Sequence, residues 1–254
     1  MENYHTHTRR CFHADGEDRD YVLKAIDVGL RVLGFSDHTP WPFDNPGKKR
    51  GRMYPEQLAG YVDSIRSLRE EFAGKIDIQL GLEVEPYVQY YGWLKERIEE
   101  FSIEYLILGN HYLTEKEEKF FGHGCTPSEM AASVKNTARA VETGLFKYIC
   151  HPDLIFNNYP VFDGNCISAS RDILSLAQEH RIPIEYNTSG FIKQERGLVK
   201  GLGYPTERFW DIASEYDVDV YIGFDAHSPS FMSEERFRAA SDFLKSRGLR
   251  VRNL

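Results

Sequence analysis

Short apolar runs alternate with longer amphipathic segments along the 254 residues of this chain. Runs of strand length, bounded by polar residues or glycine, lie at 2–7, 32–36, 76–81, 105–108, 148–150, 182–186 and 218–223. Between them, apolar residues recur with the period of an α-helix at 19–29, 55–72, 88–101, 127–143, 168–180, 206–216 and 233–247. The pattern therefore predicts seven strands, each followed by a helix.

Seven βα units in succession predict a parallel sheet, which right-handed crossovers would wrap into a barrel. Only residues 249–254 follow the last predicted helix, so we expect no eighth strand. No linker, low-complexity tract or shift in composition divides the chain. We therefore predict an α/β fold, a single-domain (β/α)7 TIM-like barrel over residues 1–254, with an open doubly wound sheet as the alternative.

Composition narrows the class of protein. An apolar fraction of 41% and an aromatic fraction of 13% are sufficient for a packed core. The chain has no apolar run of about 18 residues or more and no signal-like start, so we expect a cytoplasmic protein without a membrane partner. The four cysteines contain no CxxC spacing, which predicts reduced thiols at Cys11, Cys125, Cys150 and Cys166.

The net charge of −8 argues against a protein that binds long nucleic acid. The longest basic cluster, Lys48-Lys49-Arg50-Gly51-Arg52, lies in a polar loop, where solvated charges are the simplest interpretation. A small anionic substrate is compatible with an acidic protein if bound metal ions supply local positive charge.

Histidines and carboxylates gather where the predicted strands end. The chain has nine histidines, and all except His123 and His180 lie at such an end or just after it. The candidate metal ligands are His5, His7, His13, His38, Glu83, His111, His151, Asp225 and His227. The carboxyl ends of parallel strands meet at one edge of a barrel, so these side chains should converge.

The spacing of these residues strengthens the prediction. Residues i and i+2 of a strand point the same way, so His5 and His7 aim together, as do Asp225 and His227. HxH alone arises by chance in many proteins, but HxH on the first strand, DxH on the last and four single ligands between them are specific. Imidazole with carboxylate suits Zn, Mn or Fe. We predict a metalloenzyme active site.

Several motifs follow one another in a defined order. They are Tyr4-His5-Thr6-His7-Thr8, Gly34-Phe35-Ser36-Asp37-His38, Gly81-Leu82-Glu83-Val84-Glu85, Cys150-His151-Pro152-Asp153, Glu185-Tyr186-Asn187-Thr188-Ser189-Gly190 and Gly223-Phe224-Asp225-Ala226-His227-Ser228, together with His13 and His111. In this order the chain resembles the PHP (polymerase and histidinol phosphatase) family over nearly its whole length, and it is similar to the stand-alone histidinol-phosphate phosphatases. The resemblance implies a distorted (β/α)7 barrel and a trinuclear metal site.

The resemblance also implies how three divalent ions (Zn, Fe or Mn) would share the ligands. One ion would bind His5, His7, Glu83 and Asp225; a second would share Glu83 and add His111 and His151; the third would bind His13, His38 and His227. Asp15 is an alternative to His13. Glu85 is an alternative to Glu83, because the two point to the same strand face and only the motif separates them. Asp37 and Asp153 are candidates for orienting the neighbouring imidazoles.

The implied activity is hydrolysis of a small phosphorylated substrate, L-histidinol phosphate, as a step in histidine biosynthesis. Close divalent ions can share a water, lower its pKa and stabilise the leaving alkoxide. We expect direct attack by a metal-bridging hydroxide, with Glu83, Asp225 and His227 as catalytic residues. The leaving alcohol would take its proton from a metal-bound water, Asp225 or His227.

Charged loop residues are candidates for binding this substrate. Loop 191–203 carries Lys193, Arg196 and Lys200, and Arg196 is the first choice for a phosphate oxygen because a guanidinium binds bidentately. Arg9, just after the HxH motif, is a further candidate. Glu85, Asp44, Trp41, Phe43 and Tyr112 could face the cationic part of the substrate. Ordinary packing or solvation is the alternative for each. His123 belongs to a loop that could overhang the site, whereas His180 should lie on the surface.

Three other functions compete with this one. Amidohydrolases also place HxH on the first strand of a barrel and Asp on the last, but this chain lacks a Lys at the end of the fourth strand to act as a carbamylated bridge. A PHP enzyme for nucleotides or nucleic-acid 3′ ends is disfavoured by the acidic charge. A non-catalytic metal-binding domain is disfavoured by the complete set of ligands.

Overall fold

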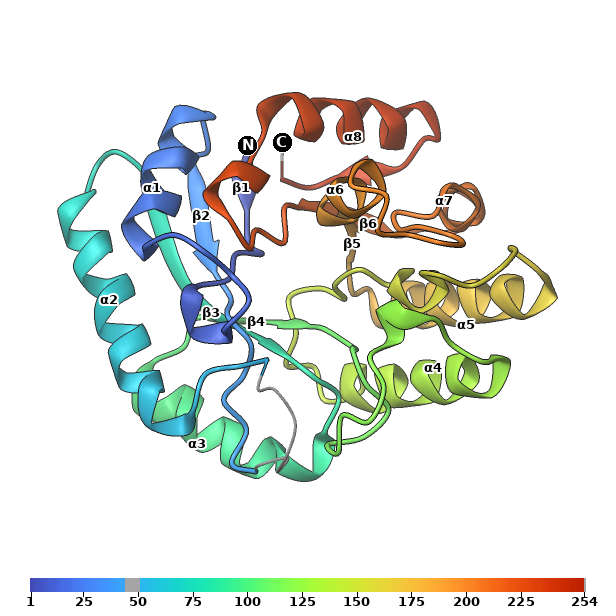
Figure 1. Cartoon of the computed structure of the whole chain (residues 1–254), viewed down its shortest axis with the longest axis horizontal. Helices are drawn as coiled ribbons and strands as arrows, with labels where there is room; N and C mark the ends of the chain where they lie inside the picture. Colours follow the sequence, from blue (N-terminus) through green and yellow to red (C-terminus); the bar gives the residue numbers. More distant parts are fainter. Residues whose placement is uncertain (44–50, 254) are drawn as a thin grey trace.

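The computed structural model describes residues 1–43 and 51–253, and it folds into a curled parallel sheet covered on its outer side by helices (Figure 1). Asp44 and the basic residues Lys48, Lys49 and Arg50 lie outside the described residues. The two ends of the chain lie side by side next to β1, where the Glu2 amide donates to the Asn253 carbonyl at 3.1 Å. The sheet therefore brings its first and last segments together.

The strands are short and all of their pairings are parallel. One group has the order β1 (Glu2–Asn3), β2 (Val32–Phe35), β3 (Asp77–Val84) and β4 (Tyr105–Leu108). The other has the order β5 (Ile184–Asn187), β6 (Asp219–Gly223) and β7 (Arg250–Val251). Isolated bridges connect the groups, from Leu108 to Ile149, from Ile149 to Ile184 and from Thr6 to Ala226. The result is a curled half-barrel rather than one uninterrupted ladder of seven strands.

Three strand predictions need correction. The strand predicted at 148–150 is reduced to a single bridging residue, Ile149, although backbone hydrogen bonds reach it from both sides. Its neighbour Pro183 has no N–H to donate, and Pro152 follows closely, which keeps the ladder from extending. The strand predicted at 2–7 ends at Asn3. The tail was expected to contain no strand, but β7 pairs with β6.

The helices follow the predicted order with shifted ends. They are α1 (Asp18–Asp27), α2 (Leu58–Glu71), α3 (Tyr91–Phe101), α4 (Pro127–Val141), α5 (Gly164–His180), α6 (Ser189–Glu195), α7 (Glu207–Ala213) and α8 (Glu234–Ser246). α5 begins four residues earlier than predicted because the Asp163 carboxylate accepts hydrogen bonds from the Asn165 and Cys166 amides. α6, which follows β5 after Thr188, was not predicted: residues 191–203 were expected to form a loop. This helix carries part of the site.

Tyrosine rings fill the inside of the curl. Tyr105 of β4 packs edge-on against Tyr4, and Tyr4 in turn packs against Tyr221 of β6. The Tyr105 ring lies against Gly34 and Gly81, where an added Cβ would collide with it. These contacts join strands on both sides of the break, so the small cluster around Tyr4 and Tyr148 faces one shared interior. A larger cluster lies between the strands and the outer helices.

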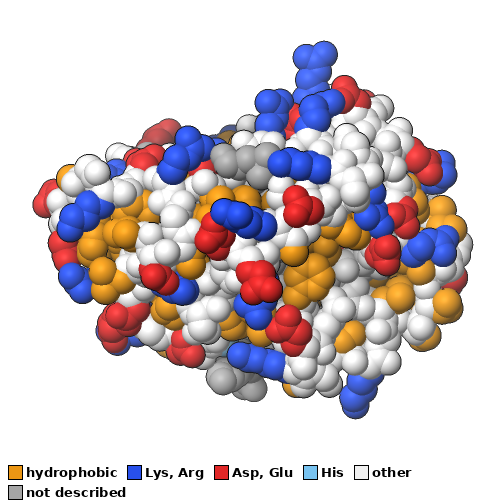
Figure 2. All heavy atoms as spheres, turned by 90° about the horizontal axis from the view of Figure 1, so that it is seen from above, with side chains coloured by type: hydrophobic (Ala, Val, Ile, Leu, Met, Phe, Trp, Pro, Cys, Tyr) orange, Lys and Arg blue, Asp and Glu red, His pale blue; other side chains and the backbone are white. Residues whose placement is uncertain are grey.

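Two further expectations can be compared with the structure. The four cysteines are buried and free, as predicted. Within the described residues, no helix combines the length and apolarity needed to cross a membrane. On the face shown in Figure 2, Lys and Arg side chains are interspersed with Asp and Glu, so this face presents no continuous basic area.

Candidate metal centre

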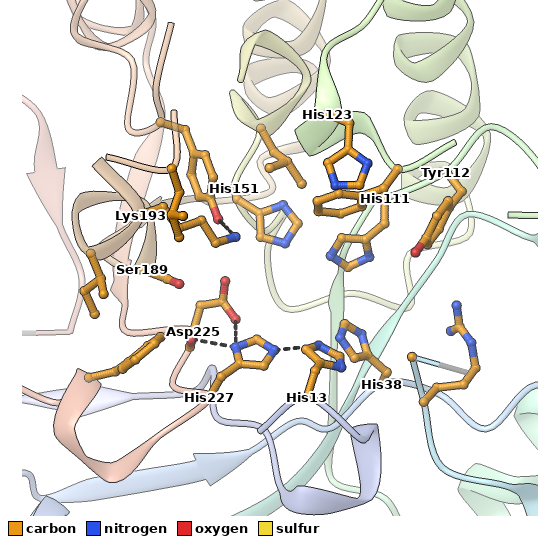
Figure 3. A pocket seen from close by; sticks show the side chains of 18 of the residues that line it. His13, His38, His111, Tyr112, His123, His151, Ser189, Lys193, Asp225 and His227 are labelled. Atoms are coloured by element: carbon orange, nitrogen blue, oxygen red, sulfur yellow. Dashed lines mark hydrogen bonds and ion pairs between the residues drawn. The ribbon is translucent and has the colours of Figure 1, made fainter. Parts of the chain in front are cut away.

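The nine predicted ligands converge at the carboxyl ends of the strands. Eight of them come from loops that follow a strand or the Ile149 bridge, and Glu83 comes from the end of β3. His5, His7 and Glu83 are fully buried, and the other six line a pocket of about 640 Å³, toward which they point: His13, His38, His111, His151, Asp225 and His227 (Figure 3). Apart from His13 and His227, these side chains are buried. The sequence therefore places a dense group of imidazoles and carboxylates at one edge of the sheet.

Glu83 occupies the centre of the group. Its Oε1 lies 3.0 Å from His151 Nε2, 3.3 Å from His111 Nε2 and 3.6 Å from His5 Nε2. Its Oε2 lies 2.9 Å from His38 Nδ1 and 3.5 Å from His7 Nε2. One carboxylate thus faces five imidazoles, with each oxygen turned to a different subset. This is the arrangement expected of a carboxylate that bridges two cations.

A second carboxylate joins the paired histidines of the first motif. Asp225 Oδ1 lies 3.1 Å from His7 Nε2 and 3.5 Å from His5 Nε2, and the two Nε2 atoms are 3.1 Å apart. On the outer side, His13 Nε2 lies 3.0 Å from His227 Nε2, and the His13 and His38 rings stack at 5.4 Å. The contacts connect all of these ligands, and they bring together three overlapping groups: His7, His38 and His227; His5, Glu83 and His151; and His5, His7 and Asp225.

Contacts on the far side of four of the rings determine which nitrogen faces the centre. His5 Nδ1 donates to Glu185 Oε1 at 2.8 Å, and His7 Nδ1 faces Asp37 Oδ1 at 3.4 Å. His13 Nδ1 donates to the Cys11 carbonyl at 2.7 Å, and His227 Nδ1 donates to the Asp225 carbonyl at 3.0 Å. A carbonyl or carboxylate can only accept, so these contacts place a proton on Nδ1 and leave Nε2 to face the centre; in the neutral His13 and His227 rings this turns the Nε2 lone pairs inward.

Inward lone pairs this close require a positive charge between them. Nε2 of His13 and Nε2 of His227 face each other at 3.0 Å, and both are acceptors in the neutral rings. Nδ1 of His38 lies 2.9 Å from Oε2 of Glu83 and Nδ1 of His111 lies 3.5 Å from Oε1 of Glu85, but among the described residues none of these buried atoms has a partner with hydrogen-bond geometry. Buried acceptors without donors are costly, and divalent cations satisfy such a donor set. The residues present fit a metal centre.

The pKa shifts follow the same charge distribution. Burial, with the neighbouring His227 and His7, lowers the pKa of His13 to about 4, so this ring is neutral at pH 7. Burial opposes a charge on His7 as well, but hydrogen bonds with Asp225 and Asp37 raise the pKa of His7 to about 9. The carboxylates therefore attract positive charge to the inner part of the centre. A metal ion that binds there would displace protons.

Backbone geometry at the centre is constrained. His151 and Asp225 adopt φ values of 27° and 47°, in a region that non-glycine residues rarely occupy. Gly109 packs against the Glu83 carboxylate and Gly223 packs against the Glu185 carboxylate, and a Cβ at either glycine would collide with the carboxylate oxygen. The positions of His151, Asp225, Glu83 and Glu185 thus depend on two strained residues and on two glycines.

The structure separates the alternatives that the sequence left open. His13 lines the pocket, whereas Asp15 is exposed and uses its amide to bind the His227 carbonyl at 2.9 Å. Glu83 is central, whereas the Glu85 carboxylate is held at 2.7 Å by Trp41 Nε1 and at 2.8 Å by Arg52 Nη1. Glu85 lines the pocket beside the predicted ligands, with His111 Nδ1 at 3.5 Å.

The predicted substrate-binding residues are distributed unevenly. Arg196 lines the pocket, with its guanidinium 5.8 Å from the centre of the Phe231 ring. Arg9 is exposed and pairs with Glu17, and Lys200 is exposed next to Asn158, so neither is brought to the pocket. Arg52 corrects the expectation of a solvated basic loop, because it is buried and pairs with Glu85 and Glu117.

Residues at the edge of the site complete the comparison. Tyr112 and His123 line the pocket together with Phe120. Trp41 and Phe43 instead belong to an aromatic cluster with Tyr87 and Tyr90. His180 is exposed at the end of α5, as predicted.

Two functional groups escaped the sequence reasoning. Glu185 is fully buried; it holds His5, and its Oε2 accepts from the His151 amide at 3.1 Å and from Asn187 Nδ2 at 2.9 Å. Its motif was recognised, but nothing in the motif gave the glutamate a partner. Lys193 was only one of three basic residues in a predicted loop, whereas α6 turns it into the pocket beside Tyr204. Predicting a helix at 189–195 would have separated Lys193 from the other two basic residues.

Comparison with known proteins agrees with this geometry. A family model described as the PHP domain matches residues 3–189. The chain belongs to the PHP domain family. The protein named "Probable histidinol-phosphatase" of Deinococcus radiodurans is 31% identical to this PHP domain over 238 residues, which cover 89% of this chain and 85% of that protein. The histidinol-phosphatase of Bacillus subtilis is 24% identical over 252 residues, covering 88% of this chain and 92% of that protein.

Solved structures of PHP proteins share the fold. Histidinol phosphate phosphatase of Lactococcus lactis, crystallised with Zn, L-histidinol and phosphate, has a TM-score of 0.72 at 19% identity, covering 98% of this chain and 94% of that one. The chain therefore spans nearly the full length of this structure and of the two curated relatives above.

Proposed function

We propose that this PHP domain protein is a metal-dependent phosphomonoesterase that hydrolyses L-histidinol phosphate to L-histidinol and phosphate, in histidine biosynthesis. The observation that carries the proposal is the cluster of imidazole nitrogens and carboxylate oxygens around Glu83, in which paired Nε2 atoms lie 3.0 and 3.1 Å apart. Near-full-length relatives named histidinol-phosphatase support the choice of substrate.

Three divalent ions, Zn, Fe or Mn, would be held by the nine residues. The first would bind His5, His7, Glu83 and Asp225; the second would bind Glu83, His111 and His151; the third would bind His13, His38 and His227. Such ions neutralise a phosphate dianion and lower the pKa of a water molecule toward neutrality. Glu185 and Asp37 keep the His5 and His7 rings oriented from behind.

The catalytic residues in this proposal are Glu83, Asp225 and His227. Glu83 holds negative charge at the centre, because burial would raise its pKa but the imidazoles of His111, His38, His5 and His151 lower it well below the usual value. Asp225 Oδ2 is oriented by Asn187 Nδ2 at 3.2 Å, and Asp225 Oδ1 lies 3.2 Å from His227 Nδ1. This pair lies on the pocket wall, where it can hold the proton that the leaving alcohol requires.

The pocket suits a small substrate with one phosphate end and one aromatic end. A volume of about 640 Å³ lies within the usual range for small-molecule sites. The wall on the side of Tyr112 carries the rings of Phe120 and His123, which pack edge-on at 5.4 Å. Flat rings of this kind can stack on an imidazole. Arg196 and Glu85 line the same pocket and are proposed to bind the substrate.

We also propose that the curled sheet belongs to a distorted (β/α)7 barrel, which forms one domain over residues 1–254. The bridges at Ile149 and between Thr6 and Ala226 support a continuous ring of parallel segments. The partner is a small phosphate ester rather than nucleic acid, in line with the net charge of −8, and the compartment is the cytoplasm.

Phosphate release tests the proposal. The protein is purified without chelator, supplied with Mn and assayed with L-histidinol phosphate beside sugar phosphates and nucleotides. We expect kcat/KM for L-histidinol phosphate to exceed that of the other esters by about a hundredfold, because a site built for one leaving group discriminates by several kcal/mol. Equal rates on every ester would overturn the substrate, and no phosphate release from metal-loaded protein would overturn the activity.

A further inference from the structure

Lys193 provides a positive charge on the wall of the pocket. It lies on α6 and points toward the site from the side opposite Tyr112 (Figure 3). Its ammonium donates to the Tyr204 hydroxyl at 2.7 Å and lies 5.1 Å from the centre of that ring. Within residues 1–43 and 51–253, no carboxylate lies within ion-pair distance of it. Lys193 thus has a neutral partner and a charge directed at the site.

Packing around Tyr204 keeps the lysine in place. Tyr204 is buried, and its carbonyl accepts from Gln194 Nε2, one residue after Lys193, at 2.9 Å. The same carbonyl lies against Gly190 of α6, where an added Cβ would collide with it. The helix and the tyrosine are therefore packed together, which keeps the Tyr204 hydroxyl within reach of the Lys193 ammonium.

The other cations of the pocket wall are placed differently. Arg52 is neutralised by Glu85 and Glu117. Arg196 is exposed at the pocket rim, over Phe231. Lys193 is half-buried, and burial would lower its pKa, but Tyr204 and the carboxylates of Asp225 and Glu83 raise it. Lys193 is therefore protonated, and its charge faces Asp225 and Glu83 at the place proposed for the substrate phosphate.

We propose that Lys193 binds a non-bridging oxygen of the substrate phosphate and that Tyr204 is the residue that positions it. A phosphate dianion in the pocket would give the ammonium the anionic partner that it lacks, through a charge-assisted hydrogen bond. The hydroxyl of Tyr204 accepts one N–H of the ammonium, which leaves its other N–H groups for the ligand. This inference rests on the proposed function, since it assigns the phosphate end of that substrate.

Inhibition by the two products, inorganic phosphate and L-histidinol, measures binding at each end of the substrate separately. In metal-loaded protein, Lys193→Met should weaken inhibition by inorganic phosphate by about tenfold or more, because a charge-assisted hydrogen bond is lost. It should raise KM for L-histidinol phosphate to a similar extent and leave inhibition by L-histidinol within about twofold. Lys193→Arg should retain more phosphate affinity than Lys193→Met, because it keeps the charge.

Two further variants make the test specific. Tyr204→Phe removes only the hydroxyl, and it should raise the inhibition constant of phosphate by about threefold while the metal content stays unchanged. Lys135→Met replaces an exposed lysine of α4 and should leave both inhibition constants unchanged. Equal loss of phosphate and L-histidinol binding in Lys193→Met would overturn the inference, as would unchanged phosphate affinity.

The binding of inorganic phosphate by calorimetry distinguishes failure of this inference from failure of the proposed function. If the metal-loaded wild-type protein binds phosphate in a Lys193-dependent manner but does not hydrolyse L-histidinol phosphate, the phosphate site stands and the proposed substrate fails. If it hydrolyses that ester while Lys193→Met binds phosphate as tightly as the wild type, the function stands and the role of Lys193 fails.

Discussion

Nε2 of His13 lies 3.0 Å from Nε2 of His227, and each ring uses its Nδ1 to donate to a backbone carbonyl. Two neutral imidazoles in this arrangement repel each other unless a cation lies between their lone pairs. The two residues are 214 positions apart in the chain. Their meeting is therefore a product of the fold, and it defines the outer part of the metal centre.

Removal of one of these rings should remove one metal ion. We expect His227→Ala to bind one divalent ion fewer per chain than the wild type, since the outer group then retains two of its three imidazoles. Elemental analysis of protein purified without chelator measures the ratio. Asp15→Asn is the matched control, because Asp15 lies two residues after His13 but is exposed. The metal content of this variant should equal that of the wild type. Equal metal content in His227→Ala and the wild type would contradict the assignment.

Glu185 should control metal affinity without touching the metal. In Glu185→Gln the buried carboxylate that orients His5 becomes a neutral amide, and loss of such a partner typically weakens metal binding by about 10–100-fold. Competition with a chromogenic chelator measures the affinity. Glu179→Gln, at an exposed position of α5, should behave as the wild type. An affinity unchanged by Glu185→Gln would show that His5 keeps its orientation by other means.

Gly109 should tolerate no side chain. Gly109→Ala places a Cβ against the Glu83 carboxylate, so the central ligand must move. We expect a loss of bound metal and a lower free energy of unfolding, by about 1–3 kcal/mol. Gly92→Ala is the control, because an added Cβ there meets nothing within 4 Å and α3 gains up to about 1 kcal/mol of helix propensity. Thermal denaturation and elemental analysis should separate the two variants.

Asp219 should stabilise the tail at neutral pH. Burial would raise the pKa of Asp219, but hydrogen bonds from Arg252 and Arg250 outweigh burial and lower it. A lowered pKa in the folded state means that this stabilisation is complete above the unfolded pKa of about 4 and disappears as the pH falls through the folded value. Asp219→Asn should therefore lower the free energy of unfolding by about 1–2 kcal/mol at pH 7.

The control for this prediction is the difference in the free energy of unfolding between the Asp219→Asn variant and the wild type, compared at two pH values. Denaturant unfolding of both proteins at pH 7 and near pH 3 measures it, and any effect of pH on the metal centre cancels in the difference. The gap should narrow at the lower pH. A gap that stays constant would contradict the prediction, because the stabilisation would then not depend on the ionisation of Asp219.

The sequence predicted which side chains converge better than it predicted the strands that carry them. Glu83 could be chosen over Glu85 only by motif, because both point to one face of β3; the structure separates them through Arg52, which lies in a loop without periodic pattern. The prediction of seven βα units came close, yet the strand at 148–150 was reduced to Ile149 by Pro183. Hydrophobic periodicity indicates which faces of a segment are buried, but not whether the adjacent strand can form a full ladder of hydrogen bonds with it.

The role of Lys193 shows another limit of sequence reasoning. Within α6 it faces the pocket, whereas Arg196, the first choice from the sequence, lies at the rim and Lys200 lies outside. Short helices have too few residues to show an amphipathic period. Direction within such a segment depends on tertiary contacts, here those of Gly190 with the Tyr204 carbonyl.

Metal removal and restoration is the most direct test of the central claim, that the acceptors around Glu83 hold the cations needed to hydrolyse L-histidinol phosphate. The protein is dialysed against a chelator, freed of chelator and assayed for phosphate release before and after addition of Zn, Mn or Fe. The account predicts no release from the metal-free protein and recovery with at least one of these ions, while Glu83→Gln stays inactive throughout. Undiminished release from protein shown to be metal-free would contradict it.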